Sequence, residues 1–326
     1  MTYNEDYTIT TLSASMDQYD LSIVLKDRRP IAPTGRIRQI VSGAPYTVFD
    51  GTPPFDTFPF GNICYNGSWV PGKIENYALK FDGADDHILV GTTTDFAWMH
   101  GKGNTSAFKW SVSFWMKFET APSGINNLKT IISTNDLLTG AGISILFDDR
   151  GTGAGGQDRA ILLLIYNASN QNIIALEQAN DYPDDTNWHH VVVTFDRGVG
   201  SNNGKIYIDG AFKAQANDNA YTPSDAVSLR VLTIGEGGGG AGGYNFPGSL
   251  DDLAIWDVVL TAAEVSHLYN NNIGIPAKNI QSANLYSYWD IEDGPGNSTI
   301  KDSAGTYPGT MTSMNAGSAC PYKLSG

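Results

Sequence analysis

The sequence has little of several features that mark whole classes of protein. Its 326 residues include two cysteines, Cys64 and Cys320, which are too few for a disulfide framework and lack the paired spacing of a zinc site. The two are either free or joined to each other. Only 17% of residues are charged, and 20 Lys and Arg stand against 34 Asp and Glu, a formal net charge of −14. This balance argues against nucleic acid as a partner, because phosphate backbones attract basic surfaces.

The chain also lacks segments that direct proteins to membranes. Its first ten residues, MTYNEDYTIT, have neither the basic nor the apolar region of a signal peptide. The longest apolar run, AILLLIY from Ala160 to Tyr166, is far shorter than the roughly 20 residues that cross a bilayer. We therefore expect a protein that is made in the cytoplasm, is not inserted in a membrane, and buries this run as a strand.

What the sequence has is a series of strand patterns separated by polar, Gly-rich loops. In WSVSFWMKF, Trp110 and every second residue to Phe118 fall on one face, which predicts a sandwich strand with one buried face. Asp209-Gly210 separates two short strands and predicts a type I′ hairpin. Further strands are predicted over 130–133, 142–147, 160–166, 172–177, 188–195, 205–208, 212–214 and 231–235.

One short helix interrupts this all-β pattern, within GSLDDLAIWDVVLTAAEVSHLYNN, Gly248 to Asn271. Thr261 followed three residues later by Glu264 is typical of a capping box. Val265, Leu268 and Tyr269 then form one apolar stripe, which predicts about three helical turns that pack on the sandwich edge.

The order of five segments resembles a known family. ALKFDGADDHILV, WSVSFWMKF, NWHHVVVTFDR, GKIYIDGAFK and FPGSLDDLAIWDVVLTAAEVSHLYNN follow one another as in laminin-G-like, concanavalin A-like lectin/glucanase domains. The resemblance implies an all-β fold: an antiparallel two-sheet jelly-roll sandwich with one short helix. Weak alternation over the first 75 residues predicts an extended N-terminal arm. We expect the arm over residues 1–75, the sandwich over 76–275, and a C-terminal strand and tail over 276–326 that complete or extend it.

The block YSYWDIEDGPGNSTIKDSAGTYPGTM after the helix is similar to segments of bacteriophage virion proteins. This resemblance implies a non-enzymatic virion structural protein, foremost a capsid decoration or cement protein. Its partners are then the major capsid protein or other virion proteins, with self-association into a homo-oligomer. The alternatives are a carbohydrate-binding adhesin or tail-fibre receptor-binding protein that recognises a host-surface glycan and, less favoured, a glycoside hydrolase.

Catalytic patterns are weak. The E-x-D-x-E spacing of sandwich glycosidases is absent, and the nearest substitute is Asp290 with Glu292, whose carboxylates are more typical of turns and caps than of catalysis. His189 and His190 are adjacent on a strand and point to opposite faces, so they are poorly placed to share one metal ion. We expect no enzyme activity.

Two kinds of binding residue remain as hypotheses. Tyr244 and Phe246 follow a Gly-rich stretch and are candidates for stacking on a sugar ring at a loop rim. The acidic pairs in FDGADDHI and GSLDDLAIW are candidates for calcium, which prefers carboxylate and carbonyl oxygens, and the alternative is that they are ordinary turn residues. The proposed calcium ligands are Asp82, Asp85, Asp251 and Asp252.

Overall fold

The structure is a computed structural model of the chain, and it describes residues 9–12, 23–25, 38–41, 44–47, 65, 67–136, 139–151, 156–237 and 244–317. Cys64, Cys320 and most of the predicted N-terminal arm lie outside these residues. The chain forms two compact units, Met1–Asn62 and Ile63–Gly326. In the first unit, β1 (Ile9–Leu12) pairs with β2 (Ile23–Leu25), and β3 (Arg38–Val41) pairs with β4 (Ala44–Thr47), both antiparallel.

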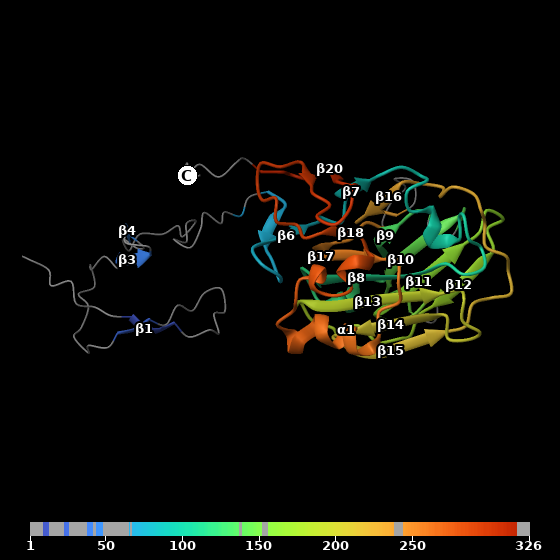
Figure 1. The fold of residues 1–326 in the computed structure, drawn as a ribbon, viewed down its shortest axis with the longest axis horizontal. Coiled ribbons are helices and arrows are strands. Elements are labelled where there is room, and N and C mark those ends of the chain that lie inside the picture. The colour runs from blue at the N-terminus through green and yellow to red at the C-terminus, as the bar shows by residue number, and fades with distance from the viewer. Residues whose placement is uncertain are drawn as a thin grey trace, which may run out of the picture. The chain divides into compact units, whose positions relative to one another are not determined.

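The second unit is a sandwich of two antiparallel sheets (Figure 1). The first sheet has the order β15-β14-β13-β8-β17-β6-β5, and β18 also pairs with β17. Its strands are β5 (Trp69–Pro71), β6 (Tyr77–Lys80), β8 (Lys109–Phe118), β13 (His189–Asp196), β14 (Gly204–Ile208), β15 (Ala211–Ala216), β17 (Gly248–Trp256) and β18 (Leu285–Trp289).

The second sheet has the order β12-β11-β10-β9-β16-β7-β20-β19. Its strands are β7 (His87–Val90), β9 (Leu128–Ser133), β10 (Gly142–Asp148), β11 (Ala160–Tyr166), β12 (Asn172–Leu176), β16 (Leu232–Ile234), β19 (Thr299–Ile300) and β20 (Gly309–Thr312). Short 3₁₀ turns lie at Ala97–His100, Pro122–Gly124, Asn270–Asn272, Ala277–Asn279 and Ser282–Asn284. The predicted all-β sandwich is confirmed, because each predicted strand reappears with its ends shifted by no more than two residues.

The main core lies between the two sheets. It contains the predicted inward residues of β8, from Trp110 to Phe118, together with apolar residues of the facing sheet such as Ile145 and Leu163. The prediction that β8 buries only one face was wrong, because Ser111, Ser113 and Trp115 on its other face are also inaccessible to solvent. Alternation marks which residues share a face, but it does not reveal what another part of the chain lays over the second face.

That second cover is the helix α1 (Ala262–Tyr269) and the segment after it. Val265 and Leu268 pack with Val192, Tyr207 and Trp256 of the first sheet in a separate apolar cluster. The capping box is confirmed: Thr261 accepts a hydrogen bond from the Glu264 N–H, and the Glu264 carboxylate accepts one from the Thr261 N–H. The helix has eight residues rather than the predicted three turns, because Asn270 adopts a left-handed conformation with φ 45° that ends it.

The central strand β17 carries two buried carboxyl groups at an irregular point of its pairing with β8. Asp251 Oδ2 accepts hydrogen bonds from the N–H groups of Lys73 and Ile74, 2.6 and 2.7 Å away. Asp252 accepts hydrogen bonds from the Tyr288 hydroxyl, at 2.5 Å, and from the Ala277 N–H. The two side chains thus fix the β5–β6 loop, β18 and the segment after α1 against one strand.

These carboxyl groups make stability depend on pH. Burial, reinforced by the neighbouring charge of Asp252, raises the pKa of Asp251 well above its usual range. Burial raises the pKa of Asp252 to about 7, while its hydrogen bonds from Tyr288 and Ala277 act in the opposite direction. In the unfolded chain both groups titrate near pH ~4. Between pH ~4 and about pH 7, the folded state therefore keeps protons on Asp251 and Asp252 that the unfolded chain has already lost.

We expect the contribution of these two groups to the free energy of unfolding to be fully present at about pH 4 and to be lost, by an amount on the order of a few kcal/mol, as the pH rises through about 7. Asp252 has left-handed backbone, with φ 50°. Asp252→Asn introduces a neutral side chain that tolerates this conformation and should make the decline shallower. Chemical denaturation at a series of pH values measures it. Asp257→Asn, at an exposed position after β17, is the matched control. Equal declines in both variants would contradict the assignment to Asp252.

Candidate functional site

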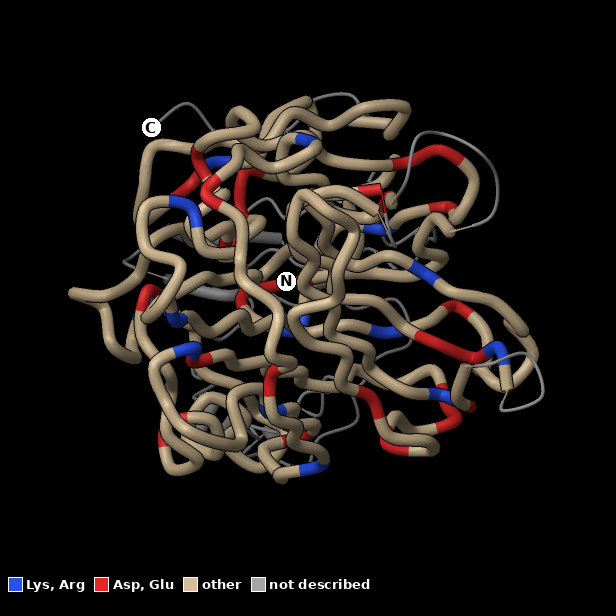
Figure 2. Tube along the Cα trace, turned by 90° about the vertical axis from the view of Figure 1, so that its right-hand side faces the viewer, with Lys and Arg blue, Asp and Glu red and all other residues tan. Residues whose placement is uncertain are grey.

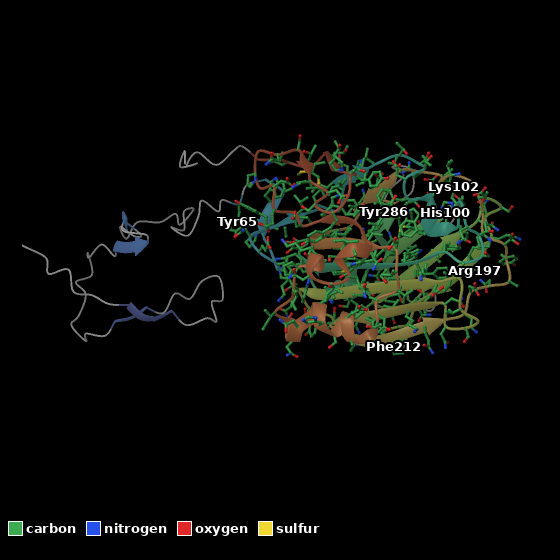
Figure 3. All side chains as sticks on the ribbon, in the orientation of Figure 1. Tyr65, His100, Lys102, Arg197, Phe212 and Tyr286 are labelled. Carbon is green, nitrogen blue, oxygen red and sulfur yellow. The ribbon has the colours of Figure 1, made fainter. Side chains whose placement is uncertain are left out.

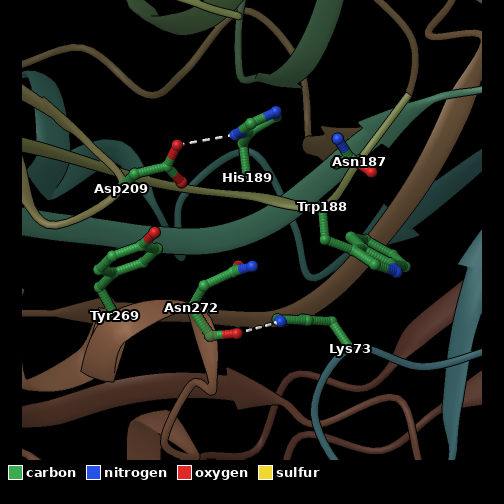
Figure 4. Close-up of a pocket in the computed structure, with 7 residues that line it drawn as sticks. All are labelled: Lys73, Asn187, Trp188, His189, Asp209, Tyr269 and Asn272. Carbon is green, nitrogen blue, oxygen red and sulfur yellow. Dashed lines mark hydrogen bonds and ion pairs between the residues drawn. The ribbon is translucent and has the colours of Figure 1, made fainter. Parts of the chain in front are cut away.

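A hollow of about 230 Å³ opens beside the C-terminal end of α1. Four separate segments form it: the β5–β6 loop, the start of β13, the β14–β15 turn, and the end of α1 with the residues after it (Figure 4). The residues that line it are Lys73, Asn187, Trp188, His189, Asp209, Tyr269 and Asn272.

One wall of the hollow is formed by a histidine that is held between two carboxylates. His189 Nδ1 lies 2.7 Å from Asp209 Oδ2, and its Nε2 lies 3.0 Å from Asp185 Oδ1. Although burial alone lowers the pKa of His189, the hydrogen bonds and charges of Asp209 and Asp185 outweigh it and raise that pKa above its usual value. The Asp209 backbone is placed by the predicted hairpin, where Asp209 and Gly210 have φ of 53° and 72°, as a type I′ turn requires.

The adjacent histidine behaves differently. His190 points to the other face of the sheet, where its Nε2 lies 2.8 Å from Ser113 Oγ and its ring faces Trp115. Burial lowers the pKa of His190 to about 3, although the charge of Asp209 acts in the opposite direction. The prediction that the two rings point apart is confirmed, and only His189 lines the hollow.

One lysine closes the lower side of the hollow. Lys73 Nζ donates a hydrogen bond to the Asn272 backbone carbonyl (Figure 4). It also lies 4.7 Å from the centroid of the Trp115 ring. Burial lowers the pKa of Lys73, and the charges of Asp209 and Asp251 offset part of this shift. The ammonium group is therefore partly desolvated and held in place.

Two half-exposed aromatic side chains lie on opposite sides of the hollow in Figure 4. Tyr269 stacks on Trp115 with ring centroids 5.9 Å apart. Trp188 has the ammonium group of Lys117 5.2 Å from its ring centroid. The sequence does not identify the residues that line the hollow as a group, because their four segments meet only in the folded chain. The Trp188-His189 pair and the Asp209-Gly210 turn were visible in the sequence, but as structural features.

Tyr244 and Phe246, the two residues predicted to stack on a sugar, lie in different surroundings. Phe246 is 0% exposed and packs edge-on against Phe81 and beside Phe118, so it offers no face to a ligand and the prediction for this residue was wrong. Its ring completes the core at the entry to β17. Tyr244 is half-buried over a small cluster on the outer face of the second sheet that includes Leu146. Residues 238–243 of the neighbouring Gly-rich stretch lie outside the described residues.

The predicted calcium ligands are also separated. Asp82 and Asp85 gather with Asp86, with one carboxylate oxygen of each within 4.8 Å of the others. Asp82 Oδ1 accepts hydrogen bonds from the N–H groups of Ala84 and Asp85.

Asp251 and Asp252 do not join this group. The pairing of Leu79 with Leu250 sends β6 toward Asp82 while β17 runs the other way toward Asp251. The carboxyl groups of Asp251 and Asp252 instead accept the hydrogen bonds described above.

Other carboxylates that resemble catalytic pairs are engaged by loops. Asp290 accepts a hydrogen bond from Ser303 Oγ, and Glu292 accepts hydrogen bonds from the N–H groups of Asn76 and Tyr77. On the second sheet, Asp148 is inaccessible to solvent, and the Arg150 guanidinium holds both of its oxygens, at 3.0 and 2.7 Å. These three carboxylates thus serve in structural hydrogen bonds.

The chain is similar to several solved structures. A candidate carbohydrate binding protein from Bacteroides ovatus is 16% identical, with a TM-score of 0.49, over 77% of this chain and 60% of the other. Domain 4 of a GH43 extracellular arabinanase from Geobacillus stearothermophilus is 18% identical, with a TM-score of 0.41, over 65% and 91%. A sialidase CBM40 from Ruminococcus gnavus, solved with α2,3-sialyllactose, is 12% identical, with a TM-score of 0.44, over 59% and 96%.

None of the curated proteins matches the chain. The chain spans 60% of the length of the Bacteroides protein. In the described part of the chain, no helix has the length and apolar character needed to cross a membrane. Residues 82–266 match the laminin G type family described as the Concanavalin A-like lectin/glucanases superfamily. This match covers more than half of the chain and lies within the two-sheet sandwich, so the chain belongs to the concanavalin A-like lectin/glucanase superfamily.

Proposed function

We propose that this protein is a non-enzymatic, carbohydrate-binding protein whose sandwich binds a glycan in the hollow beside α1. The observation that carries the proposal is the composition of the hollow: two half-exposed aromatic rings together with a lysine and two asparagines. A sugar ring has apolar faces that pack on aromatic rings and hydroxyl groups that pair with amides and charged groups. A concave site with a few converging polar groups is the usual form of a small-ligand site.

Binding without catalysis is the simpler chemistry for this site. A glycosidase of the usual kind needs two carboxyl groups on either side of the scissile bond. The hollow contains one carboxylate in its lining, Asp209, and both of its oxygens already accept hydrogen bonds, from His189 and from the His190 N–H. Neither oxygen is free to act as an acid or a nucleophile without breaking the hairpin contact.

We further propose that the protein belongs to a bacteriophage virion, as a capsid decoration or cement protein. Support comes from the resemblance of the C-terminal block and from the separate N-terminal unit, Met1–Asn62, which is available to attach the sandwich to the major capsid protein or another virion protein. Among the described residues the α-helix has eight residues, so they contain no coiled coil of the kind that builds tail fibres. Self-association of the attached copies completes this proposal.

Replacing Trp188, the partly exposed tryptophan of the hollow, tests the glycan site. We expect Trp188→Ala to weaken glycan binding about tenfold, because stacking of a ring on a sugar contributes roughly 1 kcal/mol or more. A glycan array identifies the ligand, and calorimetry compares the variants. Tyr221→Ala is the matched control, since Tyr221 is exposed and its backbone carbonyl accepts a hydrogen bond from Arg197. Arg197, labelled in Figure 3, directly follows β13 at the end opposite His189. Equal affinities for both variants would place the site elsewhere.

The virion proposal is tested by sedimentation with particles assembled in the absence of this protein. The full chain should sediment with the particles and increase their heat tolerance, and residues 63–326 should do neither while still binding the glycan. This result is expected because the separate N-terminal unit supplies the attachment. If the full chain does not sediment with these particles, the virion proposal is refuted.

We also propose calcium at the Asp82, Asp85 and Asp86 cluster, because calcium is bound by carboxylate oxygens in loops. Titration of the full chain with Ca²⁺ should show saturable binding that Asp85→Asn weakens, since one ligand loses its charge. Asp257→Asn, which changes another exposed aspartate, should bind as the unaltered chain does. An absence of binding at millimolar Ca²⁺ would contradict the proposal.

A further inference from the structure

The charged groups of the hollow differ in what they have left to offer a ligand. Asp209 accepts hydrogen bonds on both oxygens, from His189 Nδ1 at 2.7 Å and from the His190 N–H at 3.0 Å. His189 has both ring nitrogens paired, the second with Asp185. The anionic lining residue and the imidazole thus direct their hydrogen bonds into the protein rather than toward the hollow.

Lys73 is the exception. An ammonium group has three N–H donors, and the one hydrogen bond found for Nζ goes to the Asn272 carbonyl. That carbonyl and the face of Trp115 hold the ammonium group in position but carry no formal negative charge. A cation that is partly desolvated and not neutralised by direct contact with a carboxylate gains most from an anionic partner.

The uncharged groups of the hollow also favour a ligand that accepts hydrogen bonds. Trp188, Tyr269 and Asn272 line the hollow, and their side chains make no hydrogen bond to other residues in the described part of the chain. The indole N–H can only donate, whereas the hydroxyl and the amide can donate or accept. The free hydrogen-bonding capacity of the hollow is therefore weighted toward donors, and a ligand rich in acceptors complements it.

We propose that the hollow selects an acidic sugar, whose carboxylate binds Lys73 Nζ while its ring packs against Trp188 or Tyr269. This inference rests on the proposed glycan-binding function and specifies its ligand. The whole chain carries a formal charge of −14, and Figure 2 shows Asp and Glu positions distributed throughout the fold with Lys and Arg among them. Long-range attraction therefore does not favour an anion, and the preference depends on the direct contact with Lys73.

The test compares ligands that differ in one carboxylate. Calorimetry on the full chain measures binding of galacturonate and galactose oligosaccharides, of glucuronate and glucose oligosaccharides, and of sialyllactose and lactose. We expect at least one acidic member to bind about tenfold or more tightly than its neutral partner. The methyl ester of that acidic ligand, which keeps the sugar and removes the charge, should lose this advantage without any change in the protein.

Variants of the lysine identify the group responsible. Lys73→Gln should abolish the preference, so that the acidic ligand and its neutral partner bind with equal affinity, and Lys73→Arg should restore part of the preference because it keeps the charge. Lys80→Gln is the control, since Lys80 is half-exposed and pairs with Glu119 away from the hollow. If neutral ligands bind as well as acidic ones, or if the ester binds equally, this inference is overturned and the glycan-binding proposal stands. If no ligand binds, both fail.

Discussion

The buried carboxyl group of Asp251 supports much of this structure. Its Oδ2 accepts the N–H groups of Lys73 and Ile74 and thereby fixes the β5–β6 loop against the central strand. Its neighbour Asp252 does the same for Ala277 and Tyr288. Because a buried acceptor without a donor is costly, these contacts specify where the loops lie. The position of Lys73 in the hollow follows directly from this anchoring.

The hollow also depends on how the outer face of the first sheet is covered. The helix α1 packs over β13, β14 and β17, and Trp115 is covered at the margin by Tyr269 from above and by the Lys73 ammonium group. His190 lies against the same indole ring, with centroids 5.0 Å apart. Beyond the end of α1, the β14–β15 turn and the start of β13 border the hollow. The helix therefore has a structural role, and its last residues form part of the candidate site.

The superfamily contains both lectins and glucanases, so the fold alone does not decide between binding and hydrolysis. In this chain the distinction rests on the carboxylates. Asp209 is held by two donors, Asp148 by Arg150, and Glu292 by the backbone of the β5–β6 region. Carboxyl groups used in this way stabilise loops. Glu177 beside Asp148 differs from them, because burial and its hydrogen bond with Asp148 raise its pKa to about 7.

The sequence alone was sufficient for what depends on neighbouring residues. Alternation within β8, the Asp209-Gly210 turn and the Thr261–Glu264 capping box are each specified over ten residues or fewer, and all were found where expected. Tertiary structure decided everything that depends on which distant segments meet. It buried the second face of β8, placed Phe246 in the core and turned Asp251 and Asp252 toward N–H donors. It also brought Lys73 to Asn272, 199 residues away in sequence. The buried carboxyl group of Asp251 holds the Lys73 loop, and the apolar face of α1 holds the helix that precedes Asn272, so no local pattern determines this contact.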